Sequence, residues 1–366
     1  MSAHTGAAAP GGIRRVVFLP TWPDNPYQEL LAAGLGALGV EVVHVARRLW
    51  FLPSVWSRGR PEVVHLHAPD HFVVYRCCAP AALAALVITA VQLVLLRRRG
   101  VRIVWTVHDL MNHERRYPVI DRWCRRLTAR LSDALIVHCA SAHTEAAAAL
   151  GVDAAPISVV PHGHYLSAYP SSGGGRAAAR AALGLPHDGT LLLFLGNIRR
   201  HKGVDGLLQA FARLERPGTR LVVAGQPFDA EIGGEIAALA GRDPDVTLRL
   251  ATVPDNQIGQ YMAAANVVVC PFTSSLTSGS LVLALSHARA VVVPRLGCAP
   301  DMVGDDGGFL HDAGAPDGLV RALRAAVDAA PRLDGMGLAN RSRVEGHDWA
   351  GIAAQTLAVY ESGVIG

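Results

Sequence analysis

Lysine is almost absent from this sequence: its 366 residues include one lysine, Lys202, beside 33 arginines. Charged residues make up 17% and aromatic residues 6%, whereas 51% are hydrophobic. This composition excludes a disordered chain, a fibrous protein and a highly charged tail. The formal net charge of +4 is too small to indicate a nucleic-acid partner.

Several common motifs are missing or misplaced. The six cysteines lack the C-x-x-C spacing of zinc sites, and the absence of G-x-x-x-x-G-K-[ST] excludes a P-loop ATPase. Residues 34–39 fit G-x-G-x-x-G but end an expected helix instead of opening one, so they do not indicate a dinucleotide site. Residues 1–12 have neither the charged nor the apolar region of a signal peptide, and we expect a cytoplasmic protein.

One long apolar run complicates this picture. The 18 residues 79–96 contain only Thr89 and Gln92 as polar residues, and three arginines follow at 97–99. This length meets the lower limit for a membrane-spanning helix. The two main interpretations are a helix buried in an α/β domain and a helix inserted shallowly, with its arginines on anionic headgroups. A true span is disfavoured because an expected strand follows directly.

Short apolar runs alternate with helical stretches along the chain, which is typical of parallel β-α-β units. The runs are apolar on both faces, as in central strands of parallel sheets. The pattern breaks near residue 170 and then restarts. The sequence therefore predicts an α/β protein of two doubly wound, Rossmann-like domains. We expect domains over 14–168 and 188–345, a linker over 169–187 and a closing helix over 346–366.

The strongest local motif lies in residues 191–211, LLLFLGNIRRHKGVDGLLQAF. A predicted strand ends before Gly196, which permits a turn. Asn197, Arg199 and Lys202 then precede the next helix. Main-chain N–H groups at a helix start, flanked by arginine and the single lysine, suit an anion of the size of a diphosphate. The alternative is a basic loop in solvent.

A second loop of this kind follows the predicted strand NVVVCP. Its candidate donor-binding residues are Thr277, Ser278, Gly279 and Ser280. Small residues let a backbone approach phosphate closely, and the dipole of the following helix favours the negative charge. A capped turn without a ligand also explains the serines. Two such loops at strand ends of one domain favour a nucleoside-diphosphate site.

These motifs resemble the GT-B glycosyltransferases, in particular the large retaining family of bacterial mannosyl- and glucosyltransferases of polysaccharide and natural-product assembly. That family carries a Gly, Lys-Gly and Ala-Phe pattern that residues 196–211 resemble. Val160–Gly163 (VPHG), the turn at Pro254 and the D-W-x-x-I-A segment from Asp348 are similar too. The resemblance covers about residues 14–361.

The resemblance implies a cleft between the two domains and a C-terminal helix that crosses back toward the N-terminal domain. It implies that the second domain binds a nucleoside-diphosphate sugar, with the pyrophosphate on Arg199 and Lys202, and that the first binds the acceptor. It further implies transfer with retention of configuration and no metal or cofactor. His65 and His67, at another strand end, lack the further ligands that a metal would need.

Three positions depart from the family's pattern. Asn197 stands where the family often has arginine, a role that Arg199 would take. Ser275 and Leu283 stand where the family has two glutamates. The second glutamate holds the ribose hydroxyls, which a leucine cannot do, so ribose binding stays unassigned.

In the first domain, the resemblance points to His108 as the strand-end histidine that faces the donor sugar. A neutral imidazole there hydrogen-bonds a sugar hydroxyl. We expect His113 to pair with Glu114, which becomes a candidate base for the acceptor hydroxyl. His108 and Glu114 are thus the candidate catalytic side chains, and Asn25, Tyr27 and His113 lie on the acceptor side. Strand-end histidines are also commonly structural, which is the alternative for His108 and His113.

The sequence predicts a hexosyltransferase that moves a sugar from a nucleoside-diphosphate sugar to a hydroxyl of a lipid-linked saccharide or a small aglycone. Residues 79–99 would place it peripherally on the inner face of the cell membrane. Three alternatives stay open. They are a pyridoxal-phosphate phosphorylase with Lys202 as its Schiff base, a nucleotide-sugar epimerase of the same fold and a non-catalytic sugar-nucleotide-binding protein.

Overall fold

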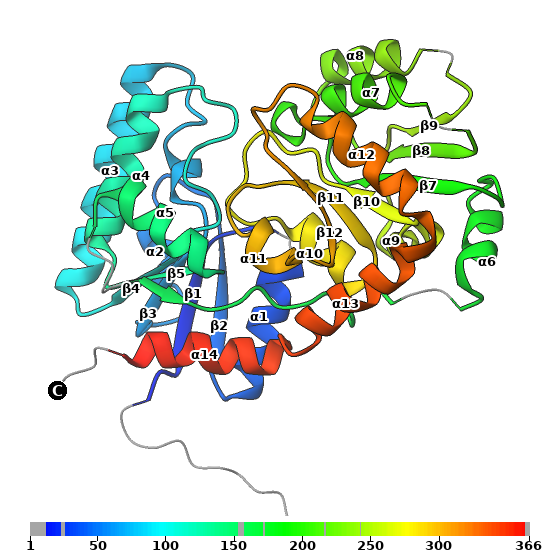
Figure 1. Ribbon diagram of the computed structural model, residues 1–366. Coiled ribbons are helices and arrows are strands. Elements are labelled where there is room, and N and C mark those ends of the chain that lie inside the picture. Colours follow the sequence, from blue (N-terminus) through cyan, green and yellow to red (C-terminus); the bar gives the residue numbers. More distant parts are fainter. Residues whose placement is uncertain are drawn as a thin grey trace, which may run out of the picture. The chain divides into compact units, whose positions relative to one another are not determined.

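The computed structural model describes residues 12–22, 26–152, 157–170, 173–215, 217–241 and 243–362. The chain forms two compact units (Figure 1): Met1–Gly163 together with His347–Gly366, and His164–Gly346. In the described part of the chain each unit holds a six-stranded sheet whose neighbouring strands are all parallel. The predicted fold class, an α/β protein of two doubly wound Rossmann-like units, is confirmed.

The sheet of the first unit has the strand order β2-β1-β3-β4-β5-β6. Its strands are β1 (Arg15–Thr21), β2 (Glu41–Ala46), β3 (Val63–Leu66), β4 (Arg102–Thr106), β5 (Ala134–Val137) and β6 (Ile157–Val159). Consecutive residues of β1, such as Val16, Val17 and Phe18, are all fully buried, because helices cover both faces of the sheet. The strand order reverses between β1 and β3, and ligands of doubly wound sheets bind at the carboxyl ends of the strands beside such a reversal.

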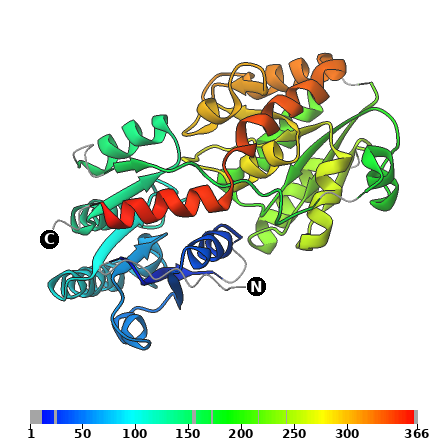
Figure 2. The ribbon, with the colours of Figure 1, turned by 90° about the horizontal axis from the view of Figure 1, so that it is seen from below.

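Helices surround this sheet. They are α1 (Pro26–Ala37), α2 (Leu52–Trp56), the 3-10 turn η1 (Pro69–Phe72), α3 (Ala79–Arg98), α4 (Pro118–Leu131), α5 (Ala140–Leu150) and α14 (Trp349–Glu361). Helix α14 comes from the end of the chain and packs beside α1 (Figure 2). Gly34 permits this contact, because a Cβ at its position would lie 2.6 Å from the carbonyl oxygen of Trp349.

Helix α3 is both anchored and exposed. One side is fixed by Gln92, whose Oε1 accepts N–H groups of Phe51 (2.8 Å) and Leu52 (3.1 Å) and whose Nε2 donates to the Leu49 carbonyl. The opposite side carries an apolar stripe in solvent: Leu83 (45% exposed), Val87 (56%), Val91 (50%) and Leu95 (39%). The helix is therefore partly buried in the unit and partly exposed on its surface, so each of the two interpretations describes part of it. It is the one described helix that is long and apolar enough to cross a membrane by length and composition.

The sheet of the second unit has the order β12-β11-β10-β7-β8-β9, and its order reverses between β7 and β10. Its strands are β7 (Thr190–Leu195), β8 (Thr219–Ala224), β9 (Val246–Arg249), β10 (Val267–Val269), β11 (Ala290–Pro294) and β12 (Gly308–His311). Its helices are α6 (Gly175–Ala182), η2 (Arg200–Lys202), α7 (Val204–Ala212), α8 (Ala230–Ala240), α9 (Asp255–Ala264), α10 (Gly279–Ser286), α11 (Ala299–Val303), α12 (Gly318–Asp328), η3 (Ala330–Arg332) and α13 (Leu333–Glu345).

The segment predicted as a linker, 169–187, contains helix α6. The buried guanidinium of Arg180 holds α6 to the second unit by donating to the Ala264 carbonyl (3.0 Å), the Asn266 side chain (2.6 Å) and the His187 carbonyl (2.8 Å). This part of the segment therefore belongs to the second unit, which begins at His164.

Candidate functional site

The strand order of the second unit brings the two predicted anion-binding loops together. Strands β7 and β10 are direct neighbours, with Leu192 opposite Val267 and Leu193 opposite Val268. Because parallel strands end at the same edge, the loop after β7 and the loop after β10 emerge side by side.

Two glycines carry the contact between these loops. Gly196 has φ +141°, and a Cβ there would lie 3.3 Å from Oγ of Ser280. Gly203 has φ +66°, and a Cβ there would lie 2.0 Å from the carbonyl oxygen of Pro271. A side chain at Gly203 would therefore push the two loops apart.

Arg199 and Lys202 hold their cations over aromatic faces in this region. Nζ of Lys202 lies 4.4 Å from the ring centre of Phe272, in the β10 loop. The Arg199 guanidinium lies 4.6 Å from the ring centre of Phe228. Both contacts are within cation–π range. Both side chains are partly buried, whereas Asn197 is exposed.

Arg200 points elsewhere, although it stands between these two residues in the chain. Its guanidinium is exposed and pairs with Glu231 at 3.0 Å and Glu235 at 2.9 Å, both on α8. These carboxylates raise the pKa of Arg200, first through the hydrogen bond and charge of Glu235. Arg200 is thus a surface ion pair and a natural control for its neighbours.

A third loop completes this edge of the sheet and was missed in the sequence analysis. A Cβ at Gly225, directly after β8, would lie 1.9 Å from the Gly196 carbonyl oxygen. Ile198 donates to the Gln226 carbonyl at 2.9 Å, and Phe228 donates back to Ile198 at 2.9 Å. The glycine that follows the apolar run RLVVA was the available signal.

Helix α10 begins at the second loop. Oγ of Ser278 accepts the N–H of Leu281 at 3.3 Å and so caps the helix. A Cβ at Gly279 would lie 3.3 Å from the hydroxyl oxygen of Tyr165, a buried residue that the sequence analysis did not select. The Oγ1 of Thr277 lies 3.5 Å from Sγ of Cys298. The loop thus presents a glycine backbone and hydroxyl groups at a helix N-terminus.

Leu283 and Ser275, which replace the family's two glutamates, differ in their exposure to solvent. Leu283 is only 8% exposed and lies among the buried residues of α10. Ser275 is partly exposed in the loop before that helix. Position 283 of α10 therefore holds a buried apolar side chain and offers no carboxylate.

In the first unit, four histidines, of which His108 is partly buried and the others are buried, gather around one tyrosine at the carboxyl ends of the strands. The ring of Tyr27 lies 5.0 to 5.9 Å, centre to centre, from the rings of His67, His108, His138 and His162. Nδ1 of His67 is 3.4 Å from Nε2 of His108. The sequence predicts Tyr27 and His108 as separate site residues, and the fold brings them together.

Hydrogen bonds connect this cluster to α14. His65 bonds the Tyr360 hydroxyl through Nδ1 (2.6 Å) and the Thr106 hydroxyl through Nε2 (2.7 Å). Thr106 in turn hydrogen-bonds Tyr27. Burial raises the pKa of Tyr27 and, with a smaller effect of other histidines, lowers the pKa of His108 well below its usual value. His108 is therefore neutral at pH 7.

A buried network of charged side chains fixes the loop after β4. The Arg125 guanidinium lies 3.2 Å from Asp70 and 2.9 Å from Asp121, and it also donates to the main chain at Asp109. Asn112 adds a bond to Asp70 at 2.9 Å. Both carboxylates contact the same guanidinium, and all three side chains are buried, so the network positions the loop without exposing a charge.

The loop itself pairs His113 with a different acid from the expected one. Nε2 of His113 lies 3.1 Å from Oδ2 of Asp109, which precedes it by four residues. Glu114 is exposed, and its main-chain N–H donates to the side chain of Asn112 at 3.0 Å. Asn25 lies outside the described residues. No three His, Cys, Asp or Glu side chains in the described ranges are placed to hold a metal ion.

Two parallel-sheet units, each with its polar groups at the carboxyl ends of its strands, define the GT-B class of glycosyltransferases. The chain matches the family model "Glycosyltransferase Family 4" over residues 6–167 and "Glycosyl transferases group 1" over residues 189–329. The chain is therefore a glycosyltransferase, with one of these two domains in each unit.

Sequence relatives agree with this assignment. A GDP-mannose:glycolipid 4-beta-D-mannosyltransferase of Xanthomonas campestris pv. campestris is 28% identical over 311 residues, which are 82% of this chain and 80% of that protein. A D-inositol 3-phosphate glycosyltransferase of Kineococcus radiotolerans is 31% identical over 252 residues, 64% of this chain and 58% of that one.

Solved structures show the same fold. Sucrose-phosphate synthase from Thermosynechococcus elongatus superimposes with a TM-score of 0.75 at 18% identity, covering 96% of this chain and 98% of that one. The Anabaena protein HepE, in complex with UDP and glucose, gives a TM-score of 0.72 at 17% identity, covering 96% of this chain and all of that one.

Proposed function

We propose that the second unit binds the diphosphate of a nucleoside-diphosphate hexose at the start of α10. The observation that carries this proposal is the contact of Gly196 with Ser280, which sets two glycine-containing loops and a helix N-terminus against one another. Arg199 and Lys202 supply positive charge beside this point. Together these groups would stabilise the departing diphosphate electrostatically, with no metal and no cofactor.

Lys202→Ala is expected to weaken nucleoside-diphosphate binding while leaving the fold intact. A charge-assisted hydrogen bond to phosphate contributes about 1.5–3 kcal/mol, so the Kd should rise by roughly 10- to 100-fold. Calorimetry with UDP, GDP and dTDP measures this and also identifies the base. Arg200→Ala is the matched control, because that cation is paired with α8. Equal affinities of wild type and Lys202→Ala would remove Lys202 from the site.

We propose that the first unit presents the acceptor hydroxyl near His108. A neutral imidazole accepts or donates one hydrogen bond to a sugar hydroxyl without bringing a charge to it. Glu114 and Asp109 are the carboxylates of the same loop. Of these, Glu114 is exposed and is the proposed base if the reaction needs one.

His108→Ala is expected to lower turnover more than it lowers nucleotide affinity, since His108 belongs to the first unit and the diphosphate site to the second. General acid–base and hydrogen-bonding groups contribute about 10²- to 10⁴-fold to rates. Sugar transfer and nucleotide titration are compared on the same preparation. A parallel loss of both would indicate a folding role, and a loss of neither would exclude His108 from the reaction.

We propose a glycolipid acceptor on the inner face of the cell membrane. The Xanthomonas relative carries GDP-mannose and glycolipid in its name, which supports a hexosyl donor and a lipid-linked acceptor. The exposed stripe of α3 and the arginines after it suit a shallow contact with an anionic bilayer. The resemblance to the retaining family supports retention at the anomeric carbon, whereas the beta linkage in the name of the Xanthomonas relative corresponds to inversion from an α-configured GDP-mannose; the anomeric configuration of the product, read by NMR, decides between them.

A further inference from the structure

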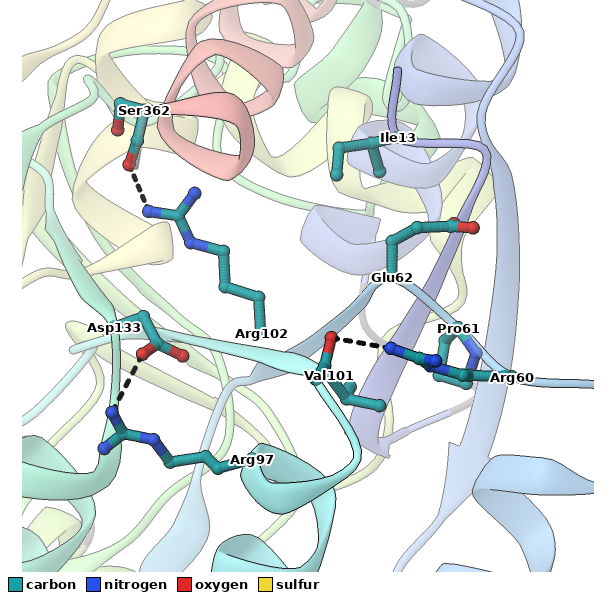
Figure 3. Close-up of a pocket in the computed structure, with 10 residues that line it drawn as sticks. Ile13, Arg60, Pro61, Glu62, Arg97, Val101, Arg102, Asp133 and Ser362 are labelled. Atoms are coloured by element: carbon teal, nitrogen blue, oxygen red, sulfur yellow. Dashed lines mark hydrogen bonds and ion pairs between the residues drawn. The ribbon is translucent and has the colours of Figure 1, made fainter. Parts of the chain in front are cut away.

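A cavity of about 800 Å³ opens in the first unit at the sheet edge opposite to His108. It lies where β3 and β4 begin, whereas His108 follows the end of β4. Figure 3 shows the side chains around it, among them Arg60, Arg97 and Arg102 together with Glu62 and Asp133. None of these residues takes part in the proposed transfer site.

Both carboxylates of this cavity are engaged in holding strands. Glu62 accepts the main-chain N–H groups of Arg14 (3.2 Å) and Arg15 (2.7 Å), which begin β1. Asp133 accepts the N–H of Ile103 at 2.8 Å and pairs with Arg97 at 3.2 Å. Asp133 thus pairs with one of the three arginines, whereas Glu62 accepts uncharged main-chain donors.

The other two arginines bond to neutral groups. Arg60 donates to the Gly100 carbonyl at 3.2 Å. Arg102 donates to the carbonyls of Tyr360 (2.6 Å) and Ser362. A guanidinium has five N–H donors, so both keep donors for a further acceptor. Three guanidinium groups and two carboxylates line the cavity, so its net charge is positive and suits an anion with several oxygens.

The cavity adjoins the end of helix α3. Arg97, in its wall, belongs to the last turn of α3, directly after the stripe of Leu83, Val87, Val91 and Leu95. The neighbouring α4 adds an exposed Trp123 (55%). Apolar side chains that enter a bilayer would thus bring this group of arginines to the level of the lipid phosphates.

We propose that this cavity binds the phosphate group of an anionic phospholipid headgroup. The phosphate chemistry follows from Arg60 and Arg102 alone. The lipid as its source rests on the membrane contact proposed above, and a free phosphate ester is the other source of the same group. The cavity is separate from the proposed donor site. Lipid binding there would therefore attach the first unit to the membrane independently of the sugar that is transferred.

Two assays on the full chain test this: calorimetry with sn-glycerol 3-phosphate, a soluble headgroup fragment, and flotation with vesicles that contain phosphatidylglycerol. Arg60→Gln should weaken glycerol 3-phosphate binding about tenfold, the loss of one charge-assisted bond, and should reduce flotation. Arg48→Gln, an exposed arginine of the same unit outside the cavity, should change neither. Val87→Gln with Val91→Gln should abolish flotation and leave glycerol 3-phosphate binding unchanged.

The outcomes separate the two steps of the proposal. Wild-type affinity of Arg60→Gln for glycerol 3-phosphate, or no binding by the wild type, overturns the anion site. Binding of glycerol 3-phosphate without flotation supports the anion site and overturns the lipid as its source. Neither assay uses sugar transfer, so failure here is distinct from failure of the proposed transferase function.

Discussion

Acidification from pH 7 to about pH 5 should sharply destabilise the first unit, because its buried histidines can be protonated only in the unfolded chain. Burial lowers the pKa of His65 to about 3, of His138 to about 4 and of His162 to about 3. The unfolded value is about 6.5. His67 and His108 shift in the same direction, first through burial and then through neighbouring histidines.

The sign follows from proton binding. Between pH 6.5 and pH 4 the unfolded chain binds more protons than the folded unit, so the stability contributed by these groups is present above pH 6.5 and is lost as the pH falls. Each fully shifted histidine lowers the free energy of unfolding by about 1.4 kcal/mol per pH unit. Three therefore remove about 4 kcal/mol per unit, against a total domain stability of about 5–15 kcal/mol.

Tryptophan fluorescence measures this selectively, since all six tryptophans belong to the first unit. The urea midpoint of the fluorescence change should fall steeply from pH 7 to pH 5. His138→Gln should reduce the pH dependence of the free energy of unfolding by about 1.4 kcal/mol per pH unit. His187→Gln, an exposed histidine of the second unit, is the control and should leave it unchanged. A constant midpoint across this range would contradict burial of neutral histidines.

Gly279→Val is expected to abolish nucleoside-diphosphate binding. The Cβ alone would lie 3.3 Å from the Tyr165 hydroxyl, and the two further methyl groups would cover the main-chain N–H groups that begin α10. Because the proposal depends on close backbone approach, we expect the affinity to fall by more than about 100-fold, the equivalent of roughly 3 kcal/mol. Calorimetry with the preferred nucleoside diphosphate measures the loss.

Ser278→Ala is the matched comparison for this variant. It removes the cap on Leu281 and should cost about 1 kcal/mol of stability, while the backbone amides stay in place. Its nucleotide affinity should therefore remain within a few-fold of the wild type. Circular dichroism of Gly279→Val checks that the unit is folded. Normal turnover by folded Gly279→Val would disprove the phosphate-loop assignment.

Local sequence was sufficient for the fold class and for the positions of the two glycine-containing loops. A strand buried on both faces needs consecutive apolar residues, as in Val16–Phe18, and a tight turn with φ above zero needs glycine, as at Gly196 and Gly203. These requirements act on neighbouring residues, so they are visible in the sequence. The basic residues after Gly196 are visible for the same reason, although only the structure separates Arg200, which pairs with glutamates of α8, from Arg199 and Lys202.

Strand order and the return of helix α14 to the first unit decided the rest. His65 and Tyr360 are 295 residues apart and share a hydrogen bond only because α14 returns to the first unit. Tyr27 meets histidines from four strand ends because β1 lies beside β3. The Gly225 loop reaches Gly196 because β8 adjoins β7. The sequence by itself determined which residues are apolar, flexible or charged. Tertiary structure decided which of them share a site, since side-chain contacts between distant segments depend on the pairing of strands and not on local preference.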